Sequence, residues 1–263
     1  MGYFYFDDSI HKRGGFALGA LVYANNSVEN MMVQAFKSAG LTIGIHEFKS
    51  HILMDKNPAM TTLRTNLKNI FLKTCRLAVT VVPYLERKRL GNEGLFCLAK
   101  VLKMNGLEKG THEVYFDEGL FRNKKEALRQ SEKIMLNKYC NLHFEQDSIK
   151  VHGLQLADLA AHTSSVMLLE TLGVIKKTIK AGEGSGYDPE MDIELGFEMW
   201  AGVRYCFFHG GTPRLDITKE DFVAEDFVAN VADYGLQIAS SCDDRLRKNI
   251  ENRFGTVYLG CIH

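Results

Sequence analysis

The sequence predicts an α/β fold in which strands and helices alternate around one central sheet. Two strand-like segments rich in aromatic and apolar residues, at 3–7 and 16–24, are separated by a short basic turn that contains two glycines. A continuous apolar run follows at 75–82, and segments with helix-start signals lie between the strands. The 263 residues are 46% hydrophobic, which suits one large domain, or one domain with a smaller lobe.

The first half of the chain gives clear boundaries for its elements. The turn predicts that 3–7 and 16–24 form a hairpin. Ser27 is expected to cap a helix that ends near Ser38, and Pro58 is expected to open a helix that ends near Thr74. The run 75–82 lacks alternation and is therefore predicted to be buried on both faces, in the centre of the sheet.

The second half continues the alternation and then changes character. We expect strands at 113–117 and 142–145, and helices at 93–103, 124–138 and 153–172. The Gly-rich stretch 182–189 predicts a boundary between an α/β domain (1–180) and an acidic, mainly helical C-terminal lobe (181–263). In this lobe, Thr218 and Asp221 resemble a capping box before a helix, and a second helix is expected at 237–252.

The net charge is zero, but its distribution is uneven. Residues 1–180 hold 25 Lys and Arg against 17 Asp and Glu, whereas residues 181–263 hold 7 against 15. This favours a polyanionic substrate for the basic part, although a solvated surface beside an acidic lobe explains the same pattern. With no secretory signal, no membrane-length apolar run and no two of the six cysteines within four residues, the expectation is a cytoplasmic protein with reduced thiols.

Acidic residues at strand ends and on an apolar helix are the candidate functional groups. Asp7 and Asp117 end predicted strands, where the active sites of open α/β sheets gather. Asp7 is favoured over Asp8, because neighbours on a strand face opposite sides. Asp158 interrupts an apolar helix, and a buried carboxylate is costly unless a cation offsets its charge. Turn formation, helix capping and an exposed polar stripe are the structural alternatives.

Histidines accompany two of these acids. On a helix, Gln155 and His162 share the face of Asp158. Glu47 lies in a His46-Glu47-Phe48-Lys49-Ser50-His51 segment, which is not a zinc-protease site because its histidines are five rather than four residues apart. Glu47 could instead ligate a metal, with His46 or His162 relaying protons.

The motifs FDDS, IHEFKS, VYFDEG and EQDSIKVHGLQLADLAAH, in this order, resemble the bacterial domain-of-unknown-function family 3800 over roughly residues 3–170. The resemblance implies a ribonuclease H-like mixed central sheet flanked by helices, with a helical C-terminal extension. It also implies a four-carboxylate metal site made of Asp7, Glu47, Asp117 and Asp158. The chain departs from the family in its first motif, where Asp8 replaces the usual Glu and Ile10-His11 replaces the Gly.

The leading hypothesis is a nuclease that hydrolyses RNA or DNA with two Mg²⁺ or Mn²⁺ ions held by these carboxylates. His162 would assist proton transfer, and Arg122, Lys124 and Lys125 would contact substrate phosphates. The alternative is a catalytically weak or inactive scaffold that binds nucleic acid or docks a partner protein or a second copy through its C-terminal lobe. No membrane association is expected.

Overall fold

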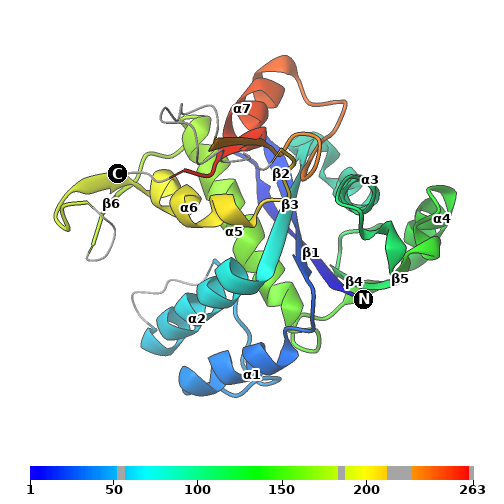
Figure 1. Cartoon of the computed structure of the whole chain (residues 1–263), viewed down its shortest axis with the longest axis horizontal. Coiled ribbons are helices and arrows are strands. Elements are labelled where there is room, and N and C mark those ends of the chain that lie inside the picture. The colour runs from blue at the N-terminus through cyan, green and yellow to red at the C-terminus, as the bar shows by residue number, and fades with distance from the viewer. Residues whose placement is uncertain (52–56, 183–186, 212–226, 261–263) are drawn as a thin grey trace, which may run out of the picture.

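The computed structural model describes residues 1–51, 57–182, 187–211 and 227–260. Its centre is a mixed sheet in the order β5-β4-β1-β2-β3-β9 (Figure 1). Strand β2 lies between β1 and β3 and is antiparallel to both. On the other side of β1, β4 and then β5 pair in parallel, and β9 pairs in parallel with β3 at the opposite edge. These strands are β1 Tyr3–His11, β2 Phe16–Ala24, β3 Cys75–Pro83, β4 His112–Asp117, β5 Cys140–Gln146 and β9 Leu236–Ile238.

Helices cover both faces of this sheet (Figure 1). On one face, α5 crosses β1 and β2 and contacts α2, α6 and α7, while α1 packs on α2. On the other face, α3 lies against β2, β3 and β9, and α4 packs on α3. The helices are α1 Glu29–Ser38, α2 Pro58–Thr74, α3 Leu90–Met104, α4 Lys124–Lys133, α5 Gly153–Thr171, α6 Leu195–Val203 and α7 Asp244–Phe254.

Smaller elements complete the described chain. Two short antiparallel pairs lie outside the main sheet: β6 Thr178–Lys180 with β7 Asp192–Glu194, and β8 Val228–Asn230 with β10 Thr256–Tyr258. The 3-10 turns are Tyr84–Arg89, Leu107–Lys109, Leu136–Lys138 and Arg204–Cys206.

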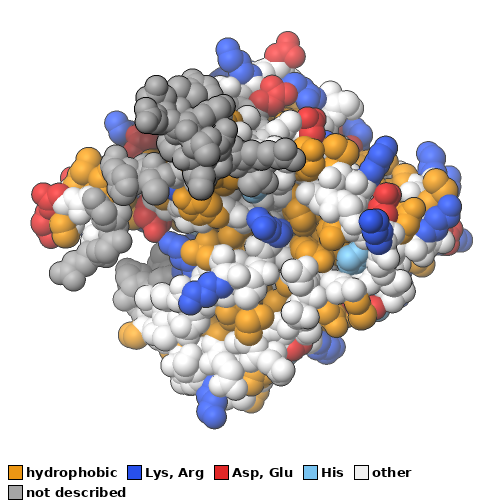
Figure 2. Space-filling model, viewed as in Figure 1, with side chains coloured by type: hydrophobic (Ala, Val, Ile, Leu, Met, Phe, Trp, Pro, Cys, Tyr) orange, Lys and Arg blue, Asp and Glu red, His pale blue; other side chains and the backbone are white. Residues whose placement is uncertain are grey.

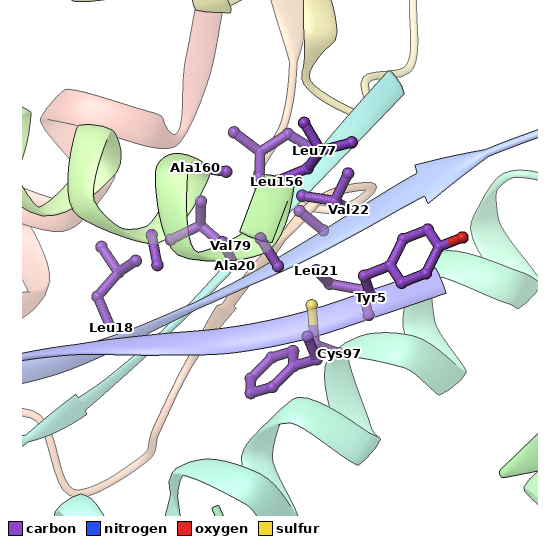
Figure 3. Close-up of a cluster of buried hydrophobic side chains, with 14 of the residues drawn as sticks. Tyr5, Leu18, Ala20, Leu21, Val22, Leu77, Val79, Cys97, Leu156 and Ala160 are labelled. Atoms are coloured by element: carbon purple, nitrogen blue, oxygen red, sulfur yellow. The ribbon is translucent and has the colours of Figure 1, made fainter. Parts of the chain in front are cut away.

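Buried side chains fill both sides of the sheet, and one part of this core lies between α5 and the strands beneath it. Figure 3 shows Leu156 and Ala160 of α5 beside Ala20 and Val22 of β2 and Leu77 and Val79 of β3, and all six are buried. Gly153, the first residue of α5, allows this close approach, because a Cβ there would lie 2.2 Å from the ring of Tyr5. Any larger residue at 153 would push α5 away from β1, the strand that carries Asp7.

The predicted α/β architecture is confirmed, with strands 16–24 and helix 58–74 placed to the residue. Strand β3 is buried almost throughout, as its lack of alternation predicts. The helix expected at 237–252 is wrong at its start: Leu236–Ile238 form a sheet strand, and α7 begins only at Asp244, after the Asp243 side chain caps it. Thr218 and Asp221 lie outside the described residues.

Candidate functional site

Strand register brings Asp7 and Asp117 to the same place. β1 and β4 pair in parallel with Tyr5 beside Tyr115, and their rings stack with centroids 5.7 Å apart. Side chains two residues apart on a strand share a face. Asp7 and Asp117, each two residues further on, therefore lie on this same face at neighbouring strand positions.

Helix α5 places Asp158 above this pair. Asp7 is only 6% exposed, and the residue that pairs with it on the adjacent strand β2 is the small Ala20. Burial raises the pKa of Asp7 well above its usual value, and the nearby charges of Asp117 and then Asp158 raise it further. Three acids from distant parts of the sequence thus share one electrostatic environment, and Asp8 also feels it, because burial and the charge of Asp158 raise its pKa.

The carboxyl group of Asp117 also has a raised pKa. Burial raises its pKa to about 6, against the opposing effects of Lys49 and of a side-chain hydrogen bond with Asp7. Two carboxyl groups can form such a bond only if one of them is protonated. Uptake of a proton by one of the two carboxyl groups relieves the repulsion between them, as a bound cation would.

The segment that contains Glu47 is anchored on Asp158. Ser50 donates to the Asp158 carboxylate twice, from its backbone nitrogen at 2.8 Å and from its Oγ at 2.6 Å. The segment is not helical, so the two histidines of the HEFKSH motif share no helix face and the exclusion of a zinc-protease site stands. Asp158 is thus both a site acid and the attachment point of a loop more than 100 residues away in sequence.

Gln155, one turn before Asp158, holds the same segment. Its Oε1 accepts from the backbone nitrogen of Phe48 at 2.8 Å, and its Nε2 donates to the carbonyl of Ser148 at 2.9 Å. The Gln155 side chain is 1% exposed, so both bonds are shielded from water. The predicted polar stripe of α5 is therefore a buried clamp rather than a solvated surface.

We expect Gln155→Leu to lower the free energy of unfolding by about 2–4 kcal/mol, because it leaves a buried N–H and a buried C=O without partners. Urea denaturation of the variant and the wild type measures this difference. Gln34→Leu, on the surface of α1, is the matched control. Equal losses for the two variants would contradict the clamp.

Glu47 has partners of its own. Its Oε1 lies 2.7 Å from the Lys49 Nζ and also accepts from the Ser148 hydroxyl. The Glu47 side chain is 22% exposed. Glu47 and Lys49 both contact the Ser148 hydroxyl, so their side chains lie on the same side of the segment, whereas the side chain of Phe48 is buried. Glu47 is thus placed at the rim of the acid cluster and carries its charge as half of an ion pair.

Lys49 is the functional candidate that the sequence argument missed. Its interactions with Glu47, and then with Asp117 and Asp7, outweigh its partial burial and raise the pKa of its ammonium group. The signal for it in the sequence is the Glu-x-Lys spacing, which lets the two charges pair outside a helix. Only the folded chain shows that Lys49 lies near Asp117.

The two histidines differ in their positions. His162 lies one turn beyond Asp158 on α5, and burial, with help from Arg64, lowers the pKa of its imidazole, so the ring is neutral near pH 7. His46 is exposed, and its Nδ1 contacts the Thr42 backbone within its own loop. His162 is therefore the better placed of the two to exchange a proton near the acids.

The three predicted phosphate contacts lie away from the acids at the start of α4. Arg122, Lys124 and Lys125 are all exposed, and the Asn123 side chain caps this helix. Figure 2 shows basic side chains gathered over α4 at the right-hand edge of the molecule. They form part of a basic surface that follows Asp117 in sequence.

No three Asp, Glu, His or Cys side chains within the described residues lie close enough together to ligate one ion as they stand. Each acid has another partner instead: Asp7 accepts from the backbone nitrogen of Asp8 and Asp117 from that of Glu118. Asp158 accepts from Ser50, and Glu47 pairs with Lys49. The donor set nevertheless suits Mg²⁺ or Mn²⁺, since carboxylate oxygens are the ligands these ions prefer. Asp7, Asp117 and Asp158 are the residues that could hold such an ion.

Two further findings complete the description. No helix in the described ranges is both long and apolar enough to cross a membrane. In comparisons with known proteins, the chain matches no protein-family model and no curated protein.

Proposed function

We propose that the protein is a divalent-metal-dependent nuclease that acts on RNA or DNA. One observation carries this proposal: three acids from distant parts of the sequence lie close together. Asp7 and Asp117 come from the neighbouring parallel strands β1 and β4, and Asp158 comes from α5, which packs above them. Such a costly arrangement of acids is typical of functional sites. The order of the four motifs, which resembles family 3800, supports the same conclusion.

The sheet topology supports a ribonuclease H-like core. Three antiparallel strands, β1 to β3, are extended at the β1 edge by the parallel strands β4 and β5. This is the arrangement expected for that superfold, and it places the first strand in the middle with an acid on it. In the described part of the C-terminal segment, β9 adds one strand at the opposite edge, next to β3.

The residues divide the chemistry between them. Bound Mg²⁺ or Mn²⁺ would supply an activated water and charge stabilisation at the leaving oxygen. Asp7, Asp117 and Asp158 would hold the metal, and the carboxyl groups with raised pKa values would release their protons as they do so. Glu47 would keep Lys49 beside the acids, where its ammonium group can meet a phosphate oxygen. His162, neutral near pH 7, would accept or return a proton.

A scaffold function is the second candidate, and one observation favours it. Each candidate ligand already has a partner inside the protein, including the ion pair between Glu47 and Lys49. A scaffold would keep these partners and would show no rise in melting temperature with Mn²⁺. A metal-binding enzyme would show a rise that grows with Mn²⁺ concentration.

A nuclease assay of the pure protein tests the proposal. Single-stranded and duplex RNA and DNA, and an RNA–DNA hybrid, are incubated with Mn²⁺ or Mg²⁺. We expect cleavage of at least one substrate, and its loss in EDTA. Absence of cleavage on all substrates, together with no thermal shift in Mn²⁺, would favour the scaffold.

A further inference from the structure

A cavity of about 440 Å³ lies between α2, α5 and α6, and its lining includes Leu159, the residue that follows Asp158 on α5. In Figure 1 these three helices lie together on the face of the sheet that carries Asp7. Its size falls within the usual range for small-ligand sites, about 300–1,000 Å³.

The walls and the rim of the cavity differ in chemistry. The walls are largely apolar and include the buried side chains of Phe71, Val166 and Val203. Arg64, Lys68 and Lys177 supply positive charge. Lys68 is paired with Glu198 of α6 at 2.8 Å, across the cavity. An apolar chamber with cations around it suits a flat ring attached to an anionic group.

The cavity reaches the acid cluster through α5. His162, which lines it, stands four residues after Asp158 and therefore on the same helix face. Arg64, on α2, is attracted to both Asp158 and Glu198, although burial lowers the pKa of its guanidinium. Among the described residues Arg64 makes no ion pair within 4.0 Å and no side-chain hydrogen bond. Within the part of the chain that the structure describes, Arg64 is thus a half-buried cation without a direct partner, which lines the cavity and is attracted to Asp158.

We propose that this cavity binds the base of the nucleotide next to the phosphate held at the acid cluster, with Arg64 contacting a phosphate of that nucleotide. This inference rests on the proposed nuclease function and names a subsite for its substrate. The apolar walls would receive the base by burying its faces. The guanidinium would form charge-assisted hydrogen bonds to the phosphate oxygens. A chain of nucleotides would then run from the cavity along α5, past His162, to Asp158.

Binding measured in EDTA separates this subsite from catalysis. The probes are 5′-phosphorylated dinucleotides of ribose and of deoxyribose, and a matching abasic sugar-phosphate. We expect isothermal titration calorimetry to show that the full chain binds at least one dinucleotide, and binds the abasic probe at least about tenfold more weakly. Arg64→Gln should weaken dinucleotide binding about tenfold or more, the loss of a charge-assisted hydrogen bond.

Two further variants distinguish a loss of the binding site from a general loss of folding or charge. Met199→Trp, at a half-buried position of α6 that lines the cavity, should also weaken dinucleotide binding by filling the space for the base. Lys73→Gln, on the exposed side of α2, removes the same charge as Arg64→Gln away from the cavity and should bind like the wild type. Thermal melting confirms that each variant is folded before it is titrated.

The possible outcomes bear separately on the subsite and on the nuclease. Equal binding of the abasic probe, no binding of any probe, or wild-type binding by folded Arg64→Gln and Met199→Trp would overturn the subsite. If the wild type also cleaves in Mn²⁺, the nuclease proposal stands without it. Base-dependent binding that both variants lose, in a protein that never cleaves, would keep the subsite and remove the nuclease.

Discussion

Asp7→Asn should stabilise the metal-free protein and abolish its response to Mn²⁺. The wild-type side chain is buried beside Asp117 and Asp158, and both repel its charge. An amide keeps the shape, and its oxygen can still accept from the backbone nitrogen of Asp8, as Asp7 does at 2.6 Å. Removing a costly functional charge typically raises stability by about 0.5–2 kcal/mol, which raises the melting temperature by a few degrees.

The sign of the pH dependence follows from the raised pKa values. Asp7 and Asp117 bind a proton more tightly in the folded than in the unfolded state, so their contribution to stability is fully present below about pH 4. For Asp117 it is lost as the pH rises through about 6, and for Asp7 it is lost over a window that also lies above the usual Asp value. The stability gain of Asp7→Asn over the wild type should therefore increase from pH 5 to pH 8.

Differential scanning fluorimetry at several pH values, with EDTA and with Mn²⁺, checks both parts. The wild type should gain stability with Mn²⁺ at pH 8, and gain less at pH 5, where protons compete for the same carboxylates. Asp244→Asn, at an exposed position in the first turn of α7 and outside the acid cluster, is the comparison variant, and it should keep the Mn²⁺ response. An Asp7→Asn protein that is less stable than wild type in EDTA, or that still responds to Mn²⁺, would contradict the expected role of Asp7.

Local signals in the sequence were sufficient where the chain carries clear start and stop residues. Pro58 fixes the start of α2, and the glycines of the turn at 12–15 fix the start of β2, so both elements are predicted to the residue. The three-residue strand β9 has no comparable signal. Its backbone pairs with β3 only because the folded chain brings residue 236 beside Val79.

Some features of the candidate site could likewise be predicted from the sequence, and others could not. Alternation along β1 predicts that Asp7 faces away from Asp8, and the apolar neighbours of Asp158 mark it as unusual. The predicted end of the first strand at Asp7 is wrong, because pairing with β2 continues β1 to His11. The pairing of Tyr5 with Tyr115, which aligns Asp7 with Asp117, depends on tertiary contacts. So do the bonds from Ser50 to Asp158 and the approach of Lys49 to Asp117. Partners about 70 to 110 residues apart leave no spacing pattern in one sequence.

Asp158→Asn and Asp158→Ala should separate the two roles of this residue. In the Asn variant, the side-chain oxygen can accept from the Ser50 backbone nitrogen while its NH₂ donates to the Ser50 hydroxyl, which rotates to accept. The Asn variant should therefore stay folded, with segment 46–50 in place. It loses the negative charge at the metal position, so cleavage should fall by at least about 10²–10³-fold.

The Ala variant removes the anchor as well as the charge. Both donors of Ser50 then lose their acceptor, at a cost of about 1–3 kcal/mol for each one left buried and unpaired. Amide hydrogen exchange should thus rise across 46–50 in Asp158→Ala and stay near the wild-type rate in Asp158→Asn, while both variants are inactive. Cleavage retained by Asp158→Asn would remove Asp158 from the chemistry and leave it as the loop's anchor alone. Faster exchange across 46–50 in both variants would mean instead that Ser50 requires the charged carboxylate, and the activity loss of the Asn variant would then reflect a displaced Lys49 as well as a missing ligand.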